Sequence, residues 1–312
     1  MNEKTLTHKK RKFKEGHWHL TLMLLPAVLL VLVFCYGPMP GIVVTFKKLR
    51  LAKGIWGSDW NGLDNFRFLF ESDSMITLLR NTIGYNMAGL ILGNLIPVIL
   101  ALSLERVKKK YAIKTYQTGM FLPYFLSWIV VSYFTLSLFE YNGGILNNII
   151  ALFGGNKIDF YSKAAIGYWP FILIFFAVWK GLGYNTLIYY GTLLGIDPSL
   201  YEAATIDGCG YFKKVWHISL PHLVPSITIL LLLSLGGIFR SDYGLYYFIP
   251  RDTGALLKAT DTLDTYVFRT LRNANNIGIS SAISFIQSIV GFLFVIVGNT
   301  LARKIDKDIA LF

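Results

Sequence analysis

The stretch ISLPHLVPSITILLLLSLGGIF, residues 218–239, contains no aspartate, glutamate, lysine or arginine. It is long enough to cross the hydrocarbon core of a bilayer as a helix, because a core about 30 Å thick needs roughly 20 apolar residues. Similar stretches recur at 20–37, 82–104, 117–139, 166–190 and 279–302. The sequence therefore predicts an all-α integral membrane protein with six transmembrane helices.

The composition of the whole chain agrees with this class. Hydrophobic residues make up 54% of the 312 positions and charged residues only 15%, whereas a soluble domain carries about 25% charged residues. The formal net charge of +12 would suit nucleic acid if the basic residues formed one stripe. They are instead scattered between apolar runs, so we attribute them to membrane orientation and expect no nucleic-acid partner.

Lysine and arginine also predict which side of the membrane each loop faces. They are concentrated in the N-terminal tail, in the short loop after the second span and in the tail after the last span. Because positively charged loops stay in the cytoplasm, both termini should be cytoplasmic. The predicted organisation is a cytoplasmic basic tail (1–19), a six-helix transmembrane domain (20–302) and a cytoplasmic tail (303–312). Loops 38–80 and 241–278 would lie outside.

Sequence motifs for chemistry are missing. No Gly-x-x-x-x-Gly-Lys-Ser/Thr loop occurs, so we expect no nucleotide site in this chain. His17-Trp18-His19 lies beside a basic tail without carboxylates, which favours an interfacial role over a metal site. There is no nucleophile-elbow motif and no evident intramembrane pair of ionisable residues. The sequence thus predicts a chain without catalytic residues, cofactor or metal.

Polar residues inside the spans are mostly neutral, which suits a pathway for a polar solute better than a proton- or sodium-coupled carrier. Aromatic rings can stack on sugar faces, and a lysine would admit an acidic group. The candidate pathway residues are Tyr124, Trp128, Tyr133, Trp179, Lys180, Tyr184, Asn185 and Gln287. The same residues would also serve helix packing or snorkelling. A self-contained channel or secondary transporter, and an enzyme acting on lipid-linked sugar, remain open as alternatives.

A polar segment, DPSLYEAATIDGCGYFKKVWHISLP at 197–221, interrupts the apolar spans. Asp197 followed by Pro198 is typical of a helix N-terminus, and Gly208 is typical of a helix end. The segment therefore predicts a short helix at about 198–208. Ala203 and Ala204 would give it a smooth surface for another protein. A plain interfacial helix would have the same spacing.

The order Glu202-Ala203-Ala204, then Asp207-Gly208, then Ile218-x-Leu220-Pro221 resembles the signature cytoplasmic loop of certain permease subunits. These belong to binding-protein-dependent ATP-binding-cassette (ABC) importers of the maltose-permease-like group. Cys209 stands where alanine is usual and Val215 where an aromatic residue is common. YGPMPGIVVTFKKL (36–49) and DTLDTYVFRTL (261–271) are similar to the branch that imports polysaccharide breakdown products, some of them acidic.

This resemblance implies a type I ABC importer permease fold in the bacterial cell membrane. It also implies four kinds of partner: a second homologous permease, two ATPase subunits that hydrolyse ATP, an extracellular solute-binding protein, and an oligosaccharide substrate. In the family this cytoplasmic helix docks in a cleft of the ATPase. Carried over by position, Glu202, Ala203, Ala204 and Gly208 would form the coupling element, and Asp207 would support its bend.

Overall fold

The computed structural model describes residues 18–273 and 276–305, and within these ranges nearly all regular structure is helical. Five helical segments are long and apolar enough to cross a membrane, and the bent pair Lys110–Phe125 and Trp128–Phe139 makes a sixth where it is counted as one broken span. The five are Thr21–Phe46, Ser74–Glu105, Lys163–Leu194, Tyr211–Leu235 and Ile277–Lys304. The predicted tails 1–19 and 303–312 fall mostly outside the described residues.

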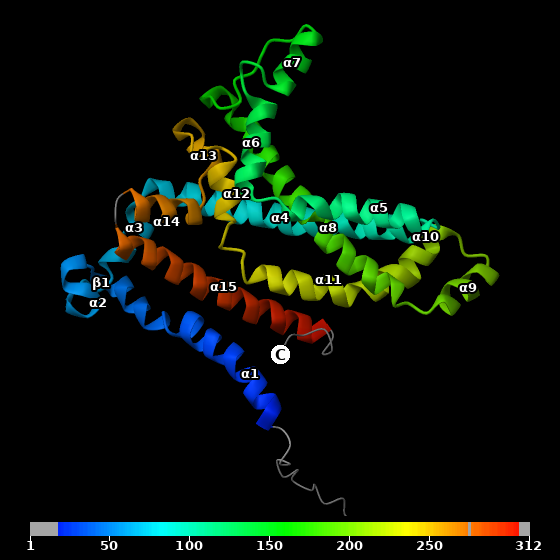
Figure 1. Cartoon of the computed structure of the whole chain (residues 1–312), viewed down its shortest axis with the longest axis horizontal. Helices are drawn as coiled ribbons and strands as arrows, with labels where there is room; N and C mark the ends of the chain where they lie inside the picture. Colours follow the sequence, from blue (N-terminus) through cyan, green and yellow to red (C-terminus); the bar gives the residue numbers. More distant parts are fainter. Residues whose placement is uncertain (1–17, 274–275, 306–312) are drawn as a thin grey trace, which may run out of the picture.

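The elements are numbered along the chain as in Figure 1. The α-helices are α1 (Trp18–Val31), α2 (Gly54–Gly57), α3 (Phe68–Glu71), α4 (Asp73–Glu105), α5 (Lys110–Phe121), α6 (Trp128–Phe139), α7 (Ile145–Leu152), α8 (Trp169–Leu194), α9 (Pro198–Ile206), α10 (Tyr211–Lys214), α11 (Leu220–Leu235), α12 (Tyr243–Phe248), α13 (Leu257–Thr260), α14 (Leu263–Arg272) and α15 (Ile277–Ile305). Short 3₁₀- or π-helices are η1 (Leu32–Tyr36), η2 (Met39–Phe46), η3 (Leu51–Lys53), η4 (Asp64–Phe66), η5 (Leu122–Phe125), η6 (Lys163–Tyr168), η7 (Val215–Ser219) and η8 (Gly254–Leu256). Two short antiparallel strands, β1 (Lys47–Lys48) and β2 (Asp59–Trp60), pair in a hairpin.

The long helices α4, α5, α8, α11 and α15 form the body of the molecule (Figure 1). At one end of this body, the last turns of α4 and α8 share a buried cluster that includes Ala101, Tyr189 and Leu193. Val215 and Leu223, at the start of the fifth span, complete it. Tyr201, in the loop that carries α9, packs against this cluster.

The third span is not the single helix predicted for 117–139. It breaks after η5, and the axis of α6 is bent by 100° from that of the segment before it. Pro123 lacks a backbone donor, and Leu126 and Ser127 take extended backbone conformations with ψ of 133° and 150°. The Ser127 hydroxyl then accepts a hydrogen bond from the Val130 amide at 3.3 Å and starts α6. Apolar composition continues through the break, so hydropathy alone could not indicate it.

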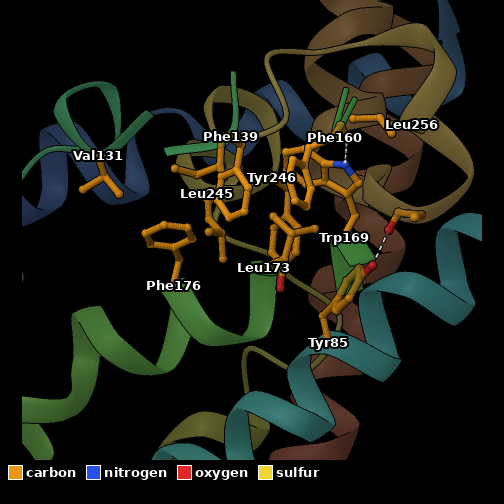
Figure 2. Close-up of a cluster of buried hydrophobic side chains, with 12 residues drawn as sticks. Tyr85, Val131, Phe139, Phe160, Trp169, Leu173, Phe176, Leu245, Tyr246 and Leu256 are labelled. Atoms are coloured by element: carbon orange, nitrogen blue, oxygen red, sulfur yellow. Dashed lines mark hydrogen bonds between the residues drawn. The ribbon is translucent and has the colours of Figure 1, made fainter. Parts of the chain in front are cut away.

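Beyond the break, α6, α7 and η6 form an arm that projects from the body (Figure 1). The base of the arm is held by a hydrophobic cluster drawn in Figure 2. Trp169, at the start of α8, is fully buried there and donates its indole N–H to the Phe160 carbonyl at 2.7 Å. Tyr85 of α4 reaches the same region and donates to the Ala259 carbonyl. The arm is therefore anchored to both α4 and α12–α13.

The first span differs from the others in its packing. It continues past its predicted end at residue 37 through η1 and η2 to Phe46. No residue of its most apolar stretch is buried, whereas 17% to 22% of the corresponding stretch is buried in the other four unbent spans. Among the residues that the structure describes, α1 therefore has almost nothing to pack against.

Candidate coupling and transport sites

The helix α9 projects from the end of the body where α10 lies (Figure 1). Asp197 caps it: its Oδ1 accepts the Ser199 amide at 2.9 Å, and Pro198 occupies the first position. That hydrogen bond lowers the pKa of Asp197. Because the folded pKa lies below the unfolded value, the cap stabilises the helix above the unfolded pKa and is lost only as pH falls through the folded pKa. At neutral pH the cap is fully charged.

The other end of α9 follows the predicted pattern with a small difference. The helix ends at Ile206, slightly before the predicted boundary near 208. Gly208 has φ of +72°, the left-handed conformation that glycine adopts without strain. Glu202, Ala203 and Asp207 are exposed and Ala204 is half-buried. The predicted coupling residues therefore lie together: Glu202, Ala203 and Ala204 on α9, and Asp207 and Gly208 in the turn that ends it.

Two further residues near Glu202 were not predicted from the sequence. Ile206 is 88% exposed, an unusual state for isoleucine on a polar helix. Tyr201 points the other way, packs against the cluster at the ends of α4 and α8, and its hydroxyl lies 2.9 Å from Ser219 Oγ. Burial raises the pKa of Tyr201 to about 12, so the phenol keeps its proton at neutral pH. An aromatic residue beside Glu202 was the only sequence signal for this contact.

A second contact ties the end of α9 to the helix that follows. Lys214 Nζ, on α10, donates to Thr205 Oγ1 at 2.5 Å. Together with the Tyr201 contact, it links α9 to the start of the fifth span at two points. The helix is thus exposed on one face and fastened to the membrane helices on the other.

The break in the third span brings together two of the predicted pathway residues, Trp128 and Lys180. Lys180 Nζ donates to the carbonyl of Leu126, which the break has removed from helical pairing. The same ammonium lies 4.8 Å from the centroid of the Trp128 ring, a cation–π contact. Trp128 Nε1 in turn donates to Asp242 Oδ2 at 2.5 Å. Asp242, which also caps α12, was not identified from the sequence.

Two more predicted pathway residues, Tyr124 in η5 and Tyr184 in α8, form an aromatic pair. The rings of Tyr124 and Tyr184 stack with centroids 5.3 Å apart and planes inclined by 12°, and each side chain is 45% exposed. Phe121 also stacks with Tyr124, with centroids 5.3 Å apart and planes inclined by 13°. A sugar ring would therefore stack on Tyr184, on the face turned away from Tyr124. Tyr133, further along α6, is 65% exposed. Trp179 instead packs beside Phe176 against the base of the arm.

Asn185 lines a different feature, a polar cavity of about 220 Å³ between α4, α8 and α11. Its Nδ2 donates to the Gly93 carbonyl at 2.9 Å. Asn86, Asn94 and Ser234 line the same cavity. Of these four polar residues, only Asn185 was predicted from the sequence as a site residue.

Gln287, another predicted pathway residue, does not line this cavity. Gln287 is only 3% exposed and donates to the Phe239 carbonyl at 2.6 Å and to Asp264 Oδ2 at 3.1 Å, so it fastens α15 to neighbouring segments.

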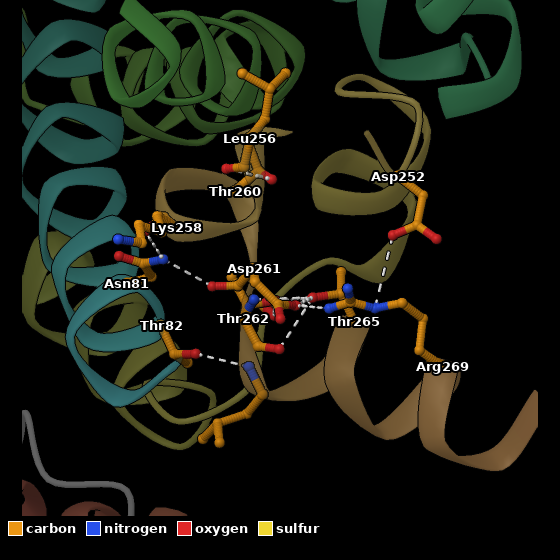
Figure 3. Close-up of polar contacts among 12 residues, drawn as sticks. Asn81, Thr82, Asp252, Leu256, Lys258, Thr260, Asp261, Thr262, Thr265 and Arg269 are labelled. Atoms are coloured by element: carbon orange, nitrogen blue, oxygen red, sulfur yellow. Dashed lines mark hydrogen bonds and ion pairs between the residues drawn. The ribbon is translucent and has the colours of Figure 1, made fainter. Parts of the chain in front are cut away.

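At the opposite end from α9, polar contacts fix the loop 252–269 to α4 (Figure 3). Asn81 Nδ2 donates to the carbonyls of Lys258 and Asp261 at 3.1 and 2.9 Å. Arg269 forms ion pairs with Asp252 and Asp261. Burial raises the pKa of Asp261, although Thr265 and Arg269 act in the opposite direction. The loop is therefore a rigid surface and not a flexible connection.

The DTLDT sequence at 261–265 explains why this loop is ordered. Thr262 and Thr265 form a reciprocal capping box at the start of α14. The Leu263 amide also donates to Thr82 Oγ1 on α4 at 3.0 Å. In the described part of the chain, no three His, Cys, Asp or Glu side chains gather as they would around a metal ion.

Comparison with known proteins identifies this arrangement. The model of the family described as binding-protein-dependent transport system inner membrane component matches residues 93–310, which include α9 and the four spans around it. The chain belongs to this family. This permease is 33% identical over 290 residues to the polygalacturonan/rhamnogalacturonan transport system permease protein YteP of Bacillus subtilis, covering 93% of this chain and 89% of that one.

Further similarity extends across the family. The permease is 28% identical over 282 residues to the sn-glycerol-3-phosphate transport system permease protein UgpA of Escherichia coli, covering 90% and 92% of the two chains. It also superposes, with a TM-score of 0.84 and 28% identity, on a chain of a bacterial ABC transporter that imports the acidic polysaccharide alginate. That match covers 93% of this chain and 96% of the other. A second structure of an alginate ABC transporter, with a periplasmic protein bound to alginate pentasaccharide, gives a TM-score of 0.83.

Proposed function

We propose that this chain is a permease subunit of an ABC importer that takes up oligosaccharides, including acidic ones. It would pair with a second homologous permease and two ATPase subunits that hydrolyse ATP, and would receive its substrate from an extracellular solute-binding protein. The similarity to YteP and to the alginate importer supports this substrate class. The observation that carries the proposal is α9, a capped and exposed helix fastened to three membrane helices.

The contacts of α9 support a coupling mechanism. When the ATPases close, a cleft on one of them pushes α9 through its exposed face, where Glu202 offers a charge to a basic partner. Because Asp197 and Gly208 end the helix firmly, it moves as a rigid unit and does not bend. The Tyr201–Ser219 and Lys214–Thr205 contacts then pass the displacement to α11 and to the ends of α4 and α8.

This assignment fixes the orientation of the chain. The end that carries α9 faces the cytoplasm together with both termini, and residues 20–302 form the transmembrane domain between the two tails. The loop 252–269 then lies outside, where its rigid surface suits docking of the solute-binding protein. The break in the third span lies on the substrate pathway: Tyr184 stacks against a sugar ring, Tyr124 supports the Tyr184 ring from the other side, and Lys180 attracts an acidic group.

Charge reversal at Glu202 tests the coupling role. We expect Glu202→Lys to leave the assembled transporter in the membrane but to abolish most of the uptake while ATP hydrolysis continues. Uptake of radiolabelled oligosaccharide is measured in proteoliposomes, and ATP hydrolysis is measured in the same vesicles as the release of phosphate. The matched control is Lys157→Glu, which reverses an exposed charge on the arm, away from the end of the molecule that carries α9. Normal uptake by Glu202→Lys would refute the coupling role.

The self-contained transporter is tested separately. The chain is purified alone and reconstituted without any ATPase or binding protein. We expect no solute flux. Flux at the rate of the complete system would favour a channel or secondary transporter and would refute the importer assignment.

A further inference from the structure

Two cavities follow one another along the face where α4 meets α8, away from the break in the third span. The outer one, about 520 Å³, is lined by Arg80, Gly84, Ile166, Pro170 and Lys258, among others. The inner one, also about 520 Å³, has an almost wholly apolar wall that includes Leu92, Phe171 and Leu182. Ile174 lines both cavities, so they adjoin each other, and we refer to the two together as the groove.

The two cavities together have about the depth of one membrane leaflet with its head groups. Arg80 and Ile96 are sixteen positions apart on α4, which corresponds to about 24 Å at 1.5 Å per residue. Half of a bilayer about 40–45 Å thick, head-group regions included, is roughly 20–22 Å. Arg80 lies just before the apolar stretch 82–104, and Pro170 lies at the start of α8. The groove therefore begins at the outer surface of the bilayer and ends near its middle.

Two cations lie at the outer mouth of this apolar groove. Arg80 and Lys258 are both exposed, and neither forms an ion pair with an acidic side chain that the structure describes. Arg80 Nη2 instead donates to the Lys258 carbonyl at 3.1 Å and to Asn81 Oδ1 at 3.2 Å. The nearby carboxylate of Asp261 is already paired with Arg269. Both positive charges thus lie at the mouth of the groove, and no described carboxylate is paired with either.

We propose that this groove binds one anionic phospholipid of the outer leaflet. Its phosphate accepts hydrogen bonds from Arg80 and Lys258, and one acyl chain lies between α4 and α8 along Ile174, Phe171 and Leu182. Charge complementarity distinguishes this occupant: an apolar helix would fill the groove but leave both cations unpaired at the membrane surface. The bound lipid would also brace α13, which carries Lys258, against α4, and so would support the outer loop network.

The head-group contact is tested on the complete transporter. It is reconstituted in nanodiscs of phosphatidylcholine with a minority of phosphatidylglycerol, released into mild detergent and examined by native mass spectrometry. We expect retained phosphatidylglycerol, reduced about thirtyfold in the double variant Arg80→Gln/Lys258→Gln, because each basic residue near a membrane surface contributes roughly fivefold. The matched control, Lys157→Gln, removes an exposed charge from the arm and should retain the lipid.

The acyl-chain contact needs its own variant. A Cβ added at Gly84 meets nothing within 4 Å, so Gly84→Leu fills the groove without a backbone clash. We expect it to displace phosphatidylglycerol. Gly191→Leu, at an equally open position on α8 outside the groove, should not displace it.

Retention of lipid by both Gly84→Leu and the double charge variant would overturn the proposal. So would quantitative cross-linking of Ile174→Cys to the second permease, because a helix of that subunit would then fill the groove.

Discussion

Gly183 and Gly244 occupy places where a side chain would meet a neighbouring segment. A Cβ on Gly183 would lie 2.3 Å from the Met120 carbonyl oxygen, at the end of α5. A Cβ on Gly244 would lie 2.2 Å from Cδ1 of Trp128. Both glycines therefore allow the two halves of the broken span to approach α8 and α12. A single sequence gives no sign of this, because the contacts are made with residues far away in the chain.

The close approach at Gly183 predicts a position-specific loss of stability. Gly183→Ala should destabilise the transporter by about 1–3 kcal/mol, because the contacted atoms belong to the backbone of α5 and cannot rotate away. Gly181→Ala is the control, since its Cβ meets nothing within 4 Å on the same helix and alanine favours helix by up to about 1 kcal/mol. The midpoint of thermal unfolding of the purified complex measures the stability of both variants. Equal midpoints for the two variants would contradict the packing described for α5 and α8.

The sequence predicted the helix ends that depend on residues nearby in the chain. It did not predict the features that depend on contacts between distant residues. Asp197-Pro198 and Gly208 define α9 because capping depends on residues within one turn of the helix end. The straight spans follow from apolar length. The break after η5 was missed because its freed carbonyl, that of Leu126, is satisfied by Lys180, 54 positions away. Tyr201 and the asparagine-lined cavity were missed for the same reason.

The broken span predicts a double role for Lys180. Lys180→Met should destabilise the protein by about 1–3 kcal/mol, because it leaves the Leu126 carbonyl without its donor. It should also lower uptake of an acidic oligosaccharide more than uptake of a neutral one of equal length, if both are delivered by the same binding protein. Lys180→Arg keeps a charge and a donor, and should preserve more of both properties. Equal loss of acidic and neutral uptake would assign Lys180 a structural role alone.

At the scale of the whole molecule, the described chain is internally well packed at both ends and incomplete along one side. The cluster beneath α9 and the polar network of the outer loop each join several spans. The first span takes part in neither the cluster nor the network. Its apolar stretch has no buried residue, and the leucines and valines of α1 are exposed. Lipid would solvate such a helix but would not fix its direction. A fixed position for α1 therefore requires a second protein surface, which the proposed partner permease would provide.

That requirement can be tested by cross-linking. Cys35 and Cys209 are free thiols, so both are first replaced by serine, and Leu25→Cys is introduced in the middle of α1. In the assembled transporter, with single cysteines placed along the membrane helices of the second permease, we expect a cross-link between the two subunits at a restricted set of positions. Pairing Leu25→Cys with Leu293→Cys on α15 of the same chain provides the control and should give none. Cross-linking to every position with equal yield would mean that α1 moves freely in lipid, and the second permease would then not hold it.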